Sequence, residues 1–332
     1  MSLINLYVMV GIQGSGKSTY IDRVNQSGLG GGLYRFCADD FRKKFPDEDN
    51  EQIFTRLYYG LGELIRQISD EKEPNYPIYL DNTSVTIKSR RKLFAQLEQY
   101  KRKISGLNFN ITALVMSTPF EICLERNAKR ERVVPEEALY RYRASFNIPF
   151  YEEGFNKIKI IDGITLKEIT LVECNNEAYA TKMYEMIKFD QENPHHKYTL
   201  GIHMSICQNL VLQREKDFCN PKCMFIAATV HDWGKFYTKT YNTEGNGIYY
   251  NHGEVGTYEL LSHLELIPQK DFTMNEILRV LAYVNYHMRP FDWNSTGTVN
   301  KATLTYGAAL VHDLCAFNEI DREACGTESE KA

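Results

Sequence analysis

The first half of the chain alternates short apolar runs with longer segments in which apolar residues recur every three or four positions. Short apolar runs are typical of buried parallel strands, and the longer spacing is typical of amphipathic helices. The runs predict strands at Ile4–Val10, Tyr34–Cys37, Pro77–Asp81, Asn110–Met116 and Lys157–Ile161. The periodic segments predict a helix after the first turn and further helices at Glu51–Ile68, Ser89–Lys103 and Phe120–Lys129. This order is typical of an α/β domain whose parallel sheet is covered on both faces.

The alternation of strands and helices stops after Asp162. Ile161–Glu173 has the pattern of a short strand or hairpin, and Glu177–Phe189 that of a connecting helix. From His195 onward the pattern is helical, and a chain of 332 residues is long enough for two cores. We therefore predict an α/β domain over residues 1–165, a linker over residues 166–190 and an all-α domain over residues 191–326, with a disordered tail at Thr327–Ala332.

Composition excludes some classes of protein. The net charge of −4 excludes a uniformly basic surface, so a nucleic acid would have to be held by local basic patches. The eight cysteines form no regular frame, and Cys219 and Cys223 are a single C-x-x-x-C pair without the second pair of a zinc knuckle. With no signal peptide and no apolar run of about 18 residues, we expect a cytoplasmic protein with reduced thiols and no membrane partner.

A glycine-rich loop follows the first predicted strand and reads Gly-Ile-Gln-Gly-Ser-Gly-Lys-Ser-Thr. This is the phosphate-loop pattern, whose backbone N–H groups surround a polyphosphate at a helix N-terminus. Lys17 is expected to reach the β- and γ-phosphates, and the Ser18 hydroxyl is expected to bind Mg²⁺. The residues expected to bind ATP or another nucleoside triphosphate are Gly11, Gly14, Ser15, Gly16, Lys17, Ser18 and Thr19.

Acidic residues end the next two predicted strands. Asp39 and Asp40 follow the second strand, where a carboxylate can accept the proton of an attacking hydroxyl. Alternatively, one of them only caps the next helix. Asp81 ends the third strand and could support the hydration shell of Mg²⁺, although an Asp-Asn pair also forms turns.

Arginines precede the helix that begins after Pro135. Arg126 and Arg130 are four residues apart and so share a helix face. Such a pair can clamp phosphates during transfer, or it can belong to a solvated helix face. The basic run from Lys88 to Lys92 could contact a nucleic-acid backbone, although a solvated helix start is the favoured explanation.

Together, the phosphate loop, Asp-Asp-Phe-Arg, Asp-Asn-Thr and the Arg-x-x-x-Arg segment resemble the 5′-OH polynucleotide kinase family over residues 3–162. The resemblance implies that Asp39 is the general base and that Arg42 orients the 3′ phosphate of the acceptor. It also implies that Arg126 and Arg130 grip the ATP phosphates.

Histidines and aspartates are spread through the second half in an order that suggests a metal centre. His-Asp doublets, with further histidines from other helices, can bind divalent metals that activate water and polarise a phosphoryl oxygen. The doublet here is His231-Asp232. The other candidates are His203, His252, His287, Asp313 and Asp321.

This order resembles the HD phosphohydrolase superfamily over residues 190–325, with an entry segment like that of HD domains appended to tRNA-nucleotidyltransferases. The resemblance implies that His203, His231 and Asp232 bind the metal, together with one aspartate of the last helix. Asp321 fits the closing segment better than Asp313, although Ile320 departs from the small residue usual before that aspartate. By the same resemblance, the residues that bind a second metal or the phosphate are His252 and His287, and those that add positive charge beside a phosphate ester are Lys235 and Arg289.

The two resemblances predict a bifunctional enzyme that heals broken nucleic-acid ends. The first domain would phosphorylate a 5′-OH end with ATP and Mg²⁺. The second would hydrolyse a 2′,3′-cyclic, 2′ or 3′ phosphate with Mn, Ni, Co or a similar metal. RNA or DNA ends and a nucleic acid ligase are the expected partners. The alternatives are a nucleoside or nucleotide kinase joined to an HD nucleotidase, and a non-catalytic RNA-binding sensor.

Overall fold

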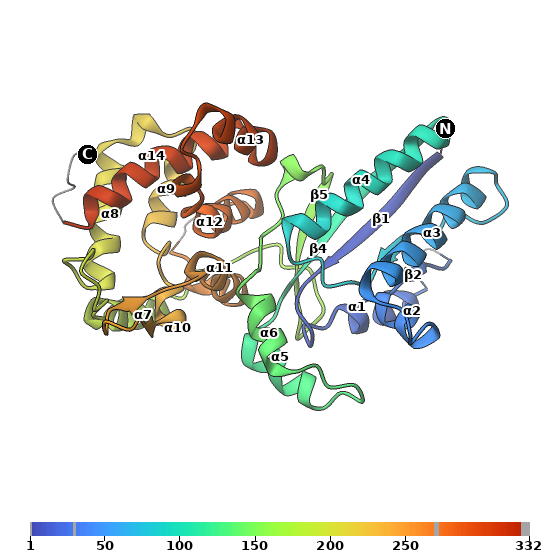
Figure 1. Cartoon of the computed structure of the whole chain (residues 1–332), viewed down its shortest axis with the longest axis horizontal. Helices are drawn as coiled ribbons and strands as arrows, with labels where there is room; N and C mark the ends of the chain where they lie inside the picture. The colour runs from blue at the N-terminus through green and yellow to red at the C-terminus, as the bar shows by residue number, and fades with distance from the viewer. Residues whose placement is uncertain (1, 29–30, 269–271, 327–332) are drawn as a thin grey trace. The chain divides into compact units, whose positions relative to one another are not determined.

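A computed structural model describes residues 2–28, 31–268 and 272–326, so the predicted disordered tail Thr327–Ala332 lies outside the described residues. The chain divides into two compact units (Figure 1). The first comprises Met1–Leu139 and Glu153–Ile169, and the second comprises Tyr140–Glu152 and Thr170–Ala332. Residues 140–152, which the sequence pattern assigned to the first domain, thus belong to the second unit.

The inserted segment 140–152 joins the second unit through buried hydrogen bonds to one helix of that unit. The Asn285 side chain accepts from the Ile148 N–H at 3.0 Å and donates to the Phe146 carbonyl at 2.9 Å. The Tyr286 hydroxyl donates to the Ile148 carbonyl at 2.8 Å. Hydrophobic periodicity reports the local secondary structure but not the core against which a segment packs, so this assignment needed the structure.

The first unit is built on a five-stranded sheet in the order β2-β3-β1-β4-β5, and all of its pairings are parallel. The longest pairing joins β1 and β4 in register from Ser2 opposite Leu107 to Val10 opposite Val115. This confirms the predicted parallel α/β architecture. The strands are β1 (Ser2–Val10), β2 (Tyr34–Phe36), β3 (Ile78–Leu80), β4 (Leu107–Ser117) and β5 (Lys157–Asp162).

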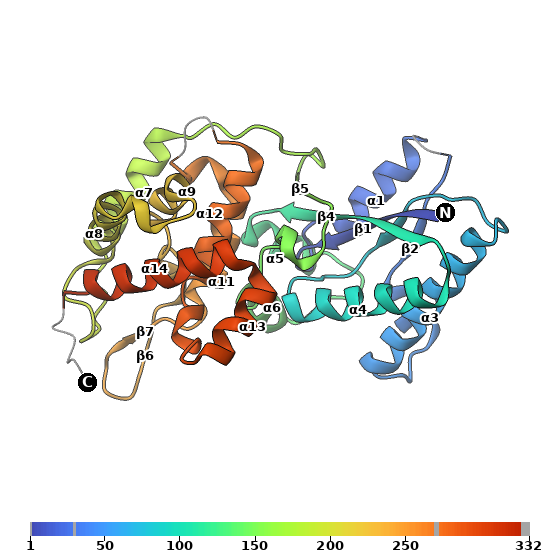
Figure 2. The ribbon, with the colours of Figure 1, turned by 90° about the horizontal axis from the view of Figure 1, so that it is seen from above.

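Helices cover both faces of the sheet, with α1 on one face and α3 and α4 on the other (Figure 2). On α3 the buried residues recur at helical spacing from Ile53 to Ile68, and its first turn is closed by a capping box between Asp49 and Gln52. The helices of this unit are α1 (Lys17–Gln26), α2 (Ala38–Lys44), α3 (Asn50–Ser69), α4 (Ile87–Lys103) and α5 (Phe120–Ala128), and α6 (Glu136–Arg143) follows them.

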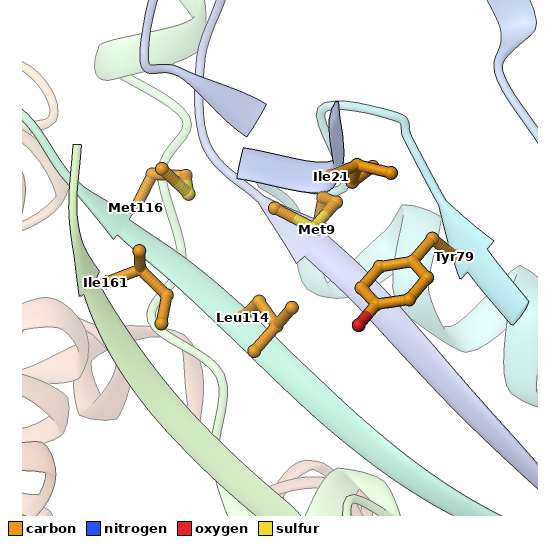
Figure 3. Close-up of a cluster of buried hydrophobic side chains, with 6 residues drawn as sticks. All are labelled: Met9, Ile21, Tyr79, Leu114, Met116 and Ile161. Carbon is orange, nitrogen blue, oxygen red and sulfur yellow. The ribbon is translucent and has the colours of Figure 1, made fainter. Parts of the chain in front are cut away.

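The core under α1 is made by side chains from neighbouring strands (Figure 3). Ile21 of α1 packs with Met9, Leu114 and Ile161, which come from three different strands. Burying one such side chain contributes about 1.5–3 kcal/mol. This packing fixes α1, and with it the loop that precedes α1, against the carboxyl ends of the strands.

Among its described residues, the regular structure of the second unit is helical apart from one small antiparallel hairpin of β6 (Thr240–Tyr241) and β7 (Gly247–Ile248). The hairpin departs from the predicted all-α domain because its paired segments are too short to produce a hydrophobic period. The helices are α7 (Asn176–Lys188), α8 (Leu200–Gln213), α9 (Pro221–Ala228), α10 (Lys235–Thr238), α11 (His252–Ser262), α12 (Met274–Tyr286), α13 (Thr296–Tyr306) and α14 (Ala308–Ala324). None of the described helices is both long enough and apolar enough to span a bilayer.

Candidate functional sites: a phosphate loop and a histidine–aspartate cluster

The glycine-rich loop lies between the end of β1 and the start of α1, as the sequence predicts. Gly14 and Gly16 have positive φ angles of 79° and 92°, a region that side chains disfavour. A Cβ atom on Gly14 would also lie only 2.3 Å from the Cys123 carbonyl oxygen. Both the backbone conformation and the close approach of α5 therefore require glycine at position 14.

Lys17 and Ser18 open α1 and face the end of β3. The Lys17 ammonium donates to the Ile12 carbonyl at 2.7 Å, and burial lowers the pKa of Lys17 against the opposing effect of Asp81. The Ser18 hydroxyl donates to Asp81 at 2.8 Å, and Asp81 is itself buried. The structure thus brings together the lysine, the hydroxyl and the carboxylate that the sequence predicted for a nucleotide–Mg²⁺ site.

Sequence reasoning missed a second partner of Asp81. Arg35 of β2 donates to Asp81 at 2.5 Å and pairs with Asp22 of α1 at 3.1 Å. Its only signal in the sequence is a charged residue within a three-residue strand. Arg35 neutralises the buried carboxylate and holds it beside Ser18.

Asp39 lies in the first turn of α2 with a cation near each of its oxygens. Oδ1 accepts from Arg42 at 2.7 Å, and Oδ2 lies 3.8 Å from the Arg130 guanidinium. Arg42 also donates to Asn50 at 3.0 Å, and Asp40 is exposed. The structure therefore places Asp39, Arg42 and Arg130 together and leaves Asp40 toward solvent.

The two arginines of the Arg-x-x-x-Arg pattern, which belong to the segment 126–134 (the lid segment), have different surroundings. Arg126 donates to the Gly163 carbonyl at 2.9 Å and to the Gly14 carbonyl at 3.3 Å, so it braces the phosphate loop. Between Arg126 and Arg130 lies Asn127, which sequence reasoning missed. Its buried side chain accepts from the Val134 N–H at 3.1 Å and donates to the Val134 carbonyl at 2.7 Å. Asn127 thereby closes the lid segment, and no pattern in the sequence indicated this contact.

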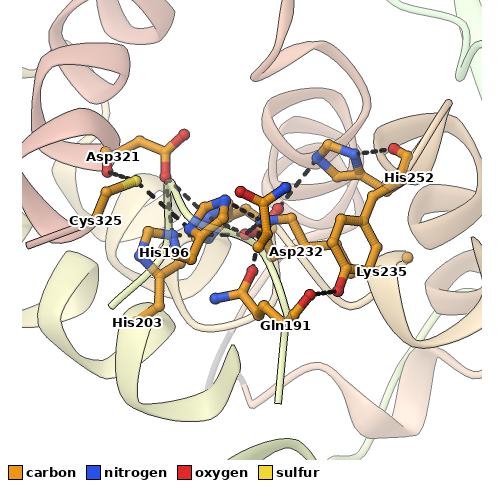
Figure 4. Close-up of polar contacts among 12 residues, drawn as sticks. Gln191, His196, His203, Asp232, Lys235, His252, Asp321 and Cys325 are labelled. Atoms are coloured by element: carbon orange, nitrogen blue, oxygen red, sulfur yellow. Dashed lines mark hydrogen bonds and ion pairs between the residues drawn. The ribbon is translucent and has the colours of Figure 1, made fainter. Parts of the chain in front are cut away.

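The histidine–aspartate cluster is assembled from four helices and one turn of the second unit (Figure 4). His203 lies on α8, and His231 and Asp232 lie in the turn after α9. His252 begins α11 and His287 follows α12, while Asp321 lies on α14. All of these except Asp321 are buried, and the side chain of Asp321 is 13% exposed.

Asp232 lies at the centre of the cluster, between Asp321 and His252 in Figure 4. Its Oδ2 lies 3.5 Å from His203 Nε2 and 3.4 Å from His231 Nε2. Its Oδ1 lies 3.1 Å from His252 Nε2 and 3.5 Å from His287 Nε2. Ligands that bind one metal at about 2.1 Å are separated by about 3.0–3.4 Å. The two oxygens therefore face two separate ligand sets at spacings that suit metal coordination.

Each of the four histidines is held by a backbone carbonyl at its Nδ1. The distances are 3.0 Å for His231, 2.8 Å for His252 and His287, and 3.3 Å for His203. Because a carbonyl can only accept, Nδ1 carries a proton, so each ring in its neutral form directs the Nε2 lone pair into the cluster.

His203 Nε2 has a hydrogen-bond partner in Asp321 at 2.9 Å, but the Nε2 atoms of the other three histidines are less well satisfied. His231 Nε2 is buried without a hydrogen bond. His252 Nε2 and His287 Nε2 lie 3.0 Å apart, so their two lone pairs face each other. Divalent cations satisfy this arrangement, and the residues therefore fit the metal that the sequence predicted.

Neighbouring charges also shift the pKa values of the cluster residues. Burial raises the pKa of Asp232, but Lys235 and His231 outweigh it and hold that pKa well below its usual range. Burial lowers the pKa of His231, whereas Asp232 and Asp321 raise it, with a net value of about 10. The Asp232 carboxylate therefore stays ionised and pairs with the Lys235 ammonium, which lies 2.7 Å from Asp232 Oδ2.

The structure separates the two candidates for the last ligand. Asp321 lies 2.9 Å from His203 Nε2 and 3.5 Å from His231 Nε2. Asp313 instead accepts from the backbone N–H groups of Cys219 at 2.6 Å and Asn220 at 3.1 Å. Asp313 therefore caps the N-terminus of α9 and lies outside the cluster, and the geometry favours Asp321.

The two predicted phosphate-binding cations are both paired. Lys235 is buried and, besides its ion pair with Asp232, donates to Gln191 at 3.0 Å. Arg289 donates to Glu254 at 2.9 Å, and 38% of its side chain remains exposed. Arg289 can thus still meet a ligand from solvent, whereas Lys235 chiefly balances the charge of Asp232.

Two further residues at the cluster were not predicted from the sequence. Cys207 lies one turn beyond His203 on α8, and its Sγ is 3.8 Å from His203 Nε2; the four-residue spacing was the available signal. Gly234 follows the His-Asp doublet, and a Cβ there would lie 1.8 Å from the His252 carbonyl oxygen. Only glycine allows the doublet to approach α11 this closely.

Comparison with known proteins bears mainly on the first unit. A family model described as an AAA domain matches residues 6–149, which hold the phosphate loop, Asp39, Asp81 and the lid arginines. A comparison with curated proteins finds no match. The first unit is therefore a phosphate-loop α/β domain.

Solved structures resemble the chain only loosely. A fungal RNA kinase is 12% identical with a TM-score of 0.37, covering 50% of this chain and 81% of its own. A chain of the Pnkp1/Rnl/Hen1 RNA repair complex is 19% identical with a TM-score of 0.34, covering 43% of each chain. A gluconokinase from Sinorhizobium meliloti 1021 is 11% identical with a TM-score of 0.30, covering 48% of this chain and 83% of its own. Overlap at this level does not assign a function.

Proposed function

We propose that the protein heals broken nucleic-acid ends, with a 5′-OH polynucleotide kinase in the first unit and a metal-dependent phosphoesterase in the second. The observation that carries the proposal is the presence of two sets of functional side chains, one in each unit. One joins the phosphate loop to Asp39, Arg42 and Arg130. The other joins histidines of the second unit to Asp232 and Asp321. Each supplies the groups that one phosphoryl-group reaction needs.

In the kinase reaction, a 5′-hydroxyl transfers its proton to the Asp39 carboxylate while its oxygen bonds to the γ-phosphorus of ATP and ADP departs. Lys17 and Arg130 balance the charge on the transferred group, and Ser18 with Asp81 would hold Mg²⁺. The salt bridge of 2.7 Å from Arg42 orients the Asp39 carboxylate. The remaining donors of the Arg42 guanidinium can bind a phosphate of the acceptor strand.

In the phosphoesterase, the residues that would hold divalent metal are the four histidines of the cluster with Asp232 and Asp321. Such a metal supplies an activated water and polarises a phosphoryl oxygen. The backbone carbonyls fix the four rings in the tautomer that ligation requires, and Asp232 joins the two ligand sets. Arg289, partly exposed, would meet the charged phosphate ester. The proposed substrate is a 2′,3′-cyclic, 2′ or 3′ phosphate end.

The decisive experiment is incubation with ATP, Mg²⁺, Mn²⁺ and an RNA oligonucleotide that carries a 5′-OH and a 2′,3′-cyclic phosphate, followed by analysis of both ends. Lys17→Ala and Asp39→Ala should abolish 5′ phosphorylation and spare the 3′ end. Loss of a positioned base lowers a rate by about 10²–10⁴-fold. Asp40→Ala is the matched control, because Asp40 is the exposed neighbour of Asp39.

The reciprocal variants test the second unit. His231→Ala and Asp232→Ala should abolish hydrolysis of the cyclic phosphate and leave 5′ phosphorylation intact. Full metal occupancy in His231→Ala, measured by elemental analysis, would contradict the metal assignment.

The same substrates separate the rival functions. Equal turnover of free nucleosides and oligonucleotides would favour a small-molecule kinase joined to a nucleotidase, because contact between Arg42 and an acceptor phosphate predicts preference for a 3′-phosphorylated acceptor. Arg42→Lys should also weaken that preference, since lysine lacks the planar two-donor geometry. Absence of both activities and of bound metal would favour the RNA-binding sensor.

A further inference from the structure

A hollow of about 850 Å³ lies on the first unit between α2 and α3, where neither reaction uses it. Its first lining residue, Phe41, comes two residues after Asp39 along α2. Aromatic and charged side chains line it together, among them Phe41, Lys44, Phe45, Glu48, Arg56 and Tyr59. Tyr59 is 72% exposed, so its ring is open to solvent.

Arg56 forms a flat, immobilised surface in this hollow. Its guanidinium carbon lies 4.1 Å from the centroid of the Phe45 ring. Its Nε donates to both carboxylate oxygens of Glu48 at 2.7 Å. Phe45 thus covers one face of the guanidinium and Glu48 binds one edge, while the side chain stays 49% exposed. Guanidinium planes held in this way are stacking platforms for unpaired bases.

The distance from the proposed reaction centre suits a nucleotide close to the reacting end. Lys44 ends α2 five residues after Asp39, which corresponds to about 7.5 Å along the helix, and Phe45 follows it. That length matches two to three stacked base steps of about 3.4 Å. A strand whose 5′-hydroxyl lies at Asp39 can therefore place one of its first bases over Arg56.

The charge of the residues that line the hollow favours a neutral base over a phosphate. Two cationic side chains, Lys44 and Arg56, are outnumbered by the acidic Glu48, Asp49 and Glu51. This balance repels a phosphate backbone. It suits a neutral ring that carries exocyclic amino groups, because carboxylates accept hydrogen bonds from such groups.

We propose that this hollow binds a nucleobase near the 5′ end of the acceptor strand, stacked on the open face of Arg56. The inference rests on the proposed kinase function and specifies its substrate as a single strand with unpaired 5′-proximal bases.

The test measures steady-state 5′ phosphorylation of a single-stranded oligonucleotide by the full-length chain. Arg56→Ala should raise KM by about 5- to 150-fold, the range expected for the loss of one stacked base, with kcat nearly unchanged. Arg56→Lys should behave in the same way because it keeps the charge and loses the plane. The matched control is Arg66→Ala, because Arg66 also lies on α3, is 53% exposed and pairs with an acidic neighbour, Glu63.

An oligonucleotide with abasic sugars at its first three positions completes the test. Wild type should bind it about as weakly as Arg56→Ala does, and the substitution should then have no further effect. The inference would be overturned if Arg56→Ala raised KM equally for the abasic and the normal strand, or did not raise it for the normal strand. Either result would leave the proposed kinase function intact.

A binding measurement distinguishes a failure of the stacking site from a failure of the proposed kinase function. Oligonucleotides with 2-aminopurine at the first, second or third position should lose fluorescence on binding to wild type without ATP, at one position at least, and Arg56→Ala should abolish that quenching. Quenching without any phosphorylation would support base binding in the hollow and refute the proposed kinase function. Quenching that persists in Arg56→Ala would refute the stacking site.

Discussion

Asp313 and Asp321 lie on the same helix but have different neighbours, and the different roles that these neighbours predict can be measured. Asp313→Ala removes the acceptor for two backbone N–H groups at the start of α9 and for the Tyr283 hydroxyl. Hydrogen bonds to a charged group contribute about 1.5–3 kcal/mol each, and buried donors left unpaired add to the loss. Because the neighbours can relax, we expect a total loss of about 3–5 kcal/mol. For a unit of this size, the melting temperature should fall by roughly 10 °C.

Asp321→Ala should act through the metal instead. A metal present at about 1,000 times its dissociation constant stabilises the folded chain by about 4 kcal/mol. Wild type should therefore melt at a higher temperature with Mn²⁺ or Ni²⁺ than after chelation. Asp321→Ala should lose most of this difference, together with bound metal and hydrolysis of the cyclic phosphate, because it removes a carboxylate 2.9 Å from His203 Nε2.

Differential scanning calorimetry with and without chelator, combined with elemental analysis, distinguishes the two roles. Asp313→Ala should melt lower in both conditions and keep the metal-dependent difference. Asp313→Asn, which retains an acceptor oxygen, should lose less stability. If Asp313→Ala lost the metal-dependent difference while Asp321→Ala kept it, the ligand assignment would be reversed.

The remaining predictions concern the lid, the glycine of the His-Asp turn and metal removal. Asn127→Ala removes both hydrogen bonds to Val134, so the KM for ATP should rise severalfold and the lid should be cleaved faster by trypsin; unchanged cleavage would contradict the bracing role. Gly234→Ala would place a Cβ 1.8 Å from the His252 carbonyl, so purified protein should contain much less metal; wild-type metal content would show that the turn can relax. Chelation followed by return of Mg²⁺ alone should restore 5′ phosphorylation and not cyclic-phosphate hydrolysis, and Mn²⁺, Ni²⁺ or Co²⁺ should restore the latter. Recovery of both activities with Mg²⁺ alone would argue against a transition metal.

The sequence alone determined those features whose physical cause is local. The phosphate loop is readable because its glycines, lysine and serine are contiguous, and the central strands of the sheet are readable because burial on both faces makes them rich in apolar residues. The order of histidines and aspartates likewise indicated a cluster, since metal ligation restricts which residue types can serve.

Features that depend on contacts between distant segments were decided by the tertiary structure. Arg35 and Asn127 have no local signature, because their partners lie on another strand or across a loop. Residues 140–152 have an ordinary sequence pattern, yet their buried hydrogen bonds place them in the second unit.

The choice between Asp313 and Asp321 shows the same division between sequence and structure. Both are aspartates on α14, and residue type and spacing left them as competitors. The structure separates them because positions eight residues apart do not share the same neighbours in a folded helix. One meets the N-terminus of α9 and the other meets His203 and His231. The sequence determined which chemical groups are available, and packing between helices decided which of them meet.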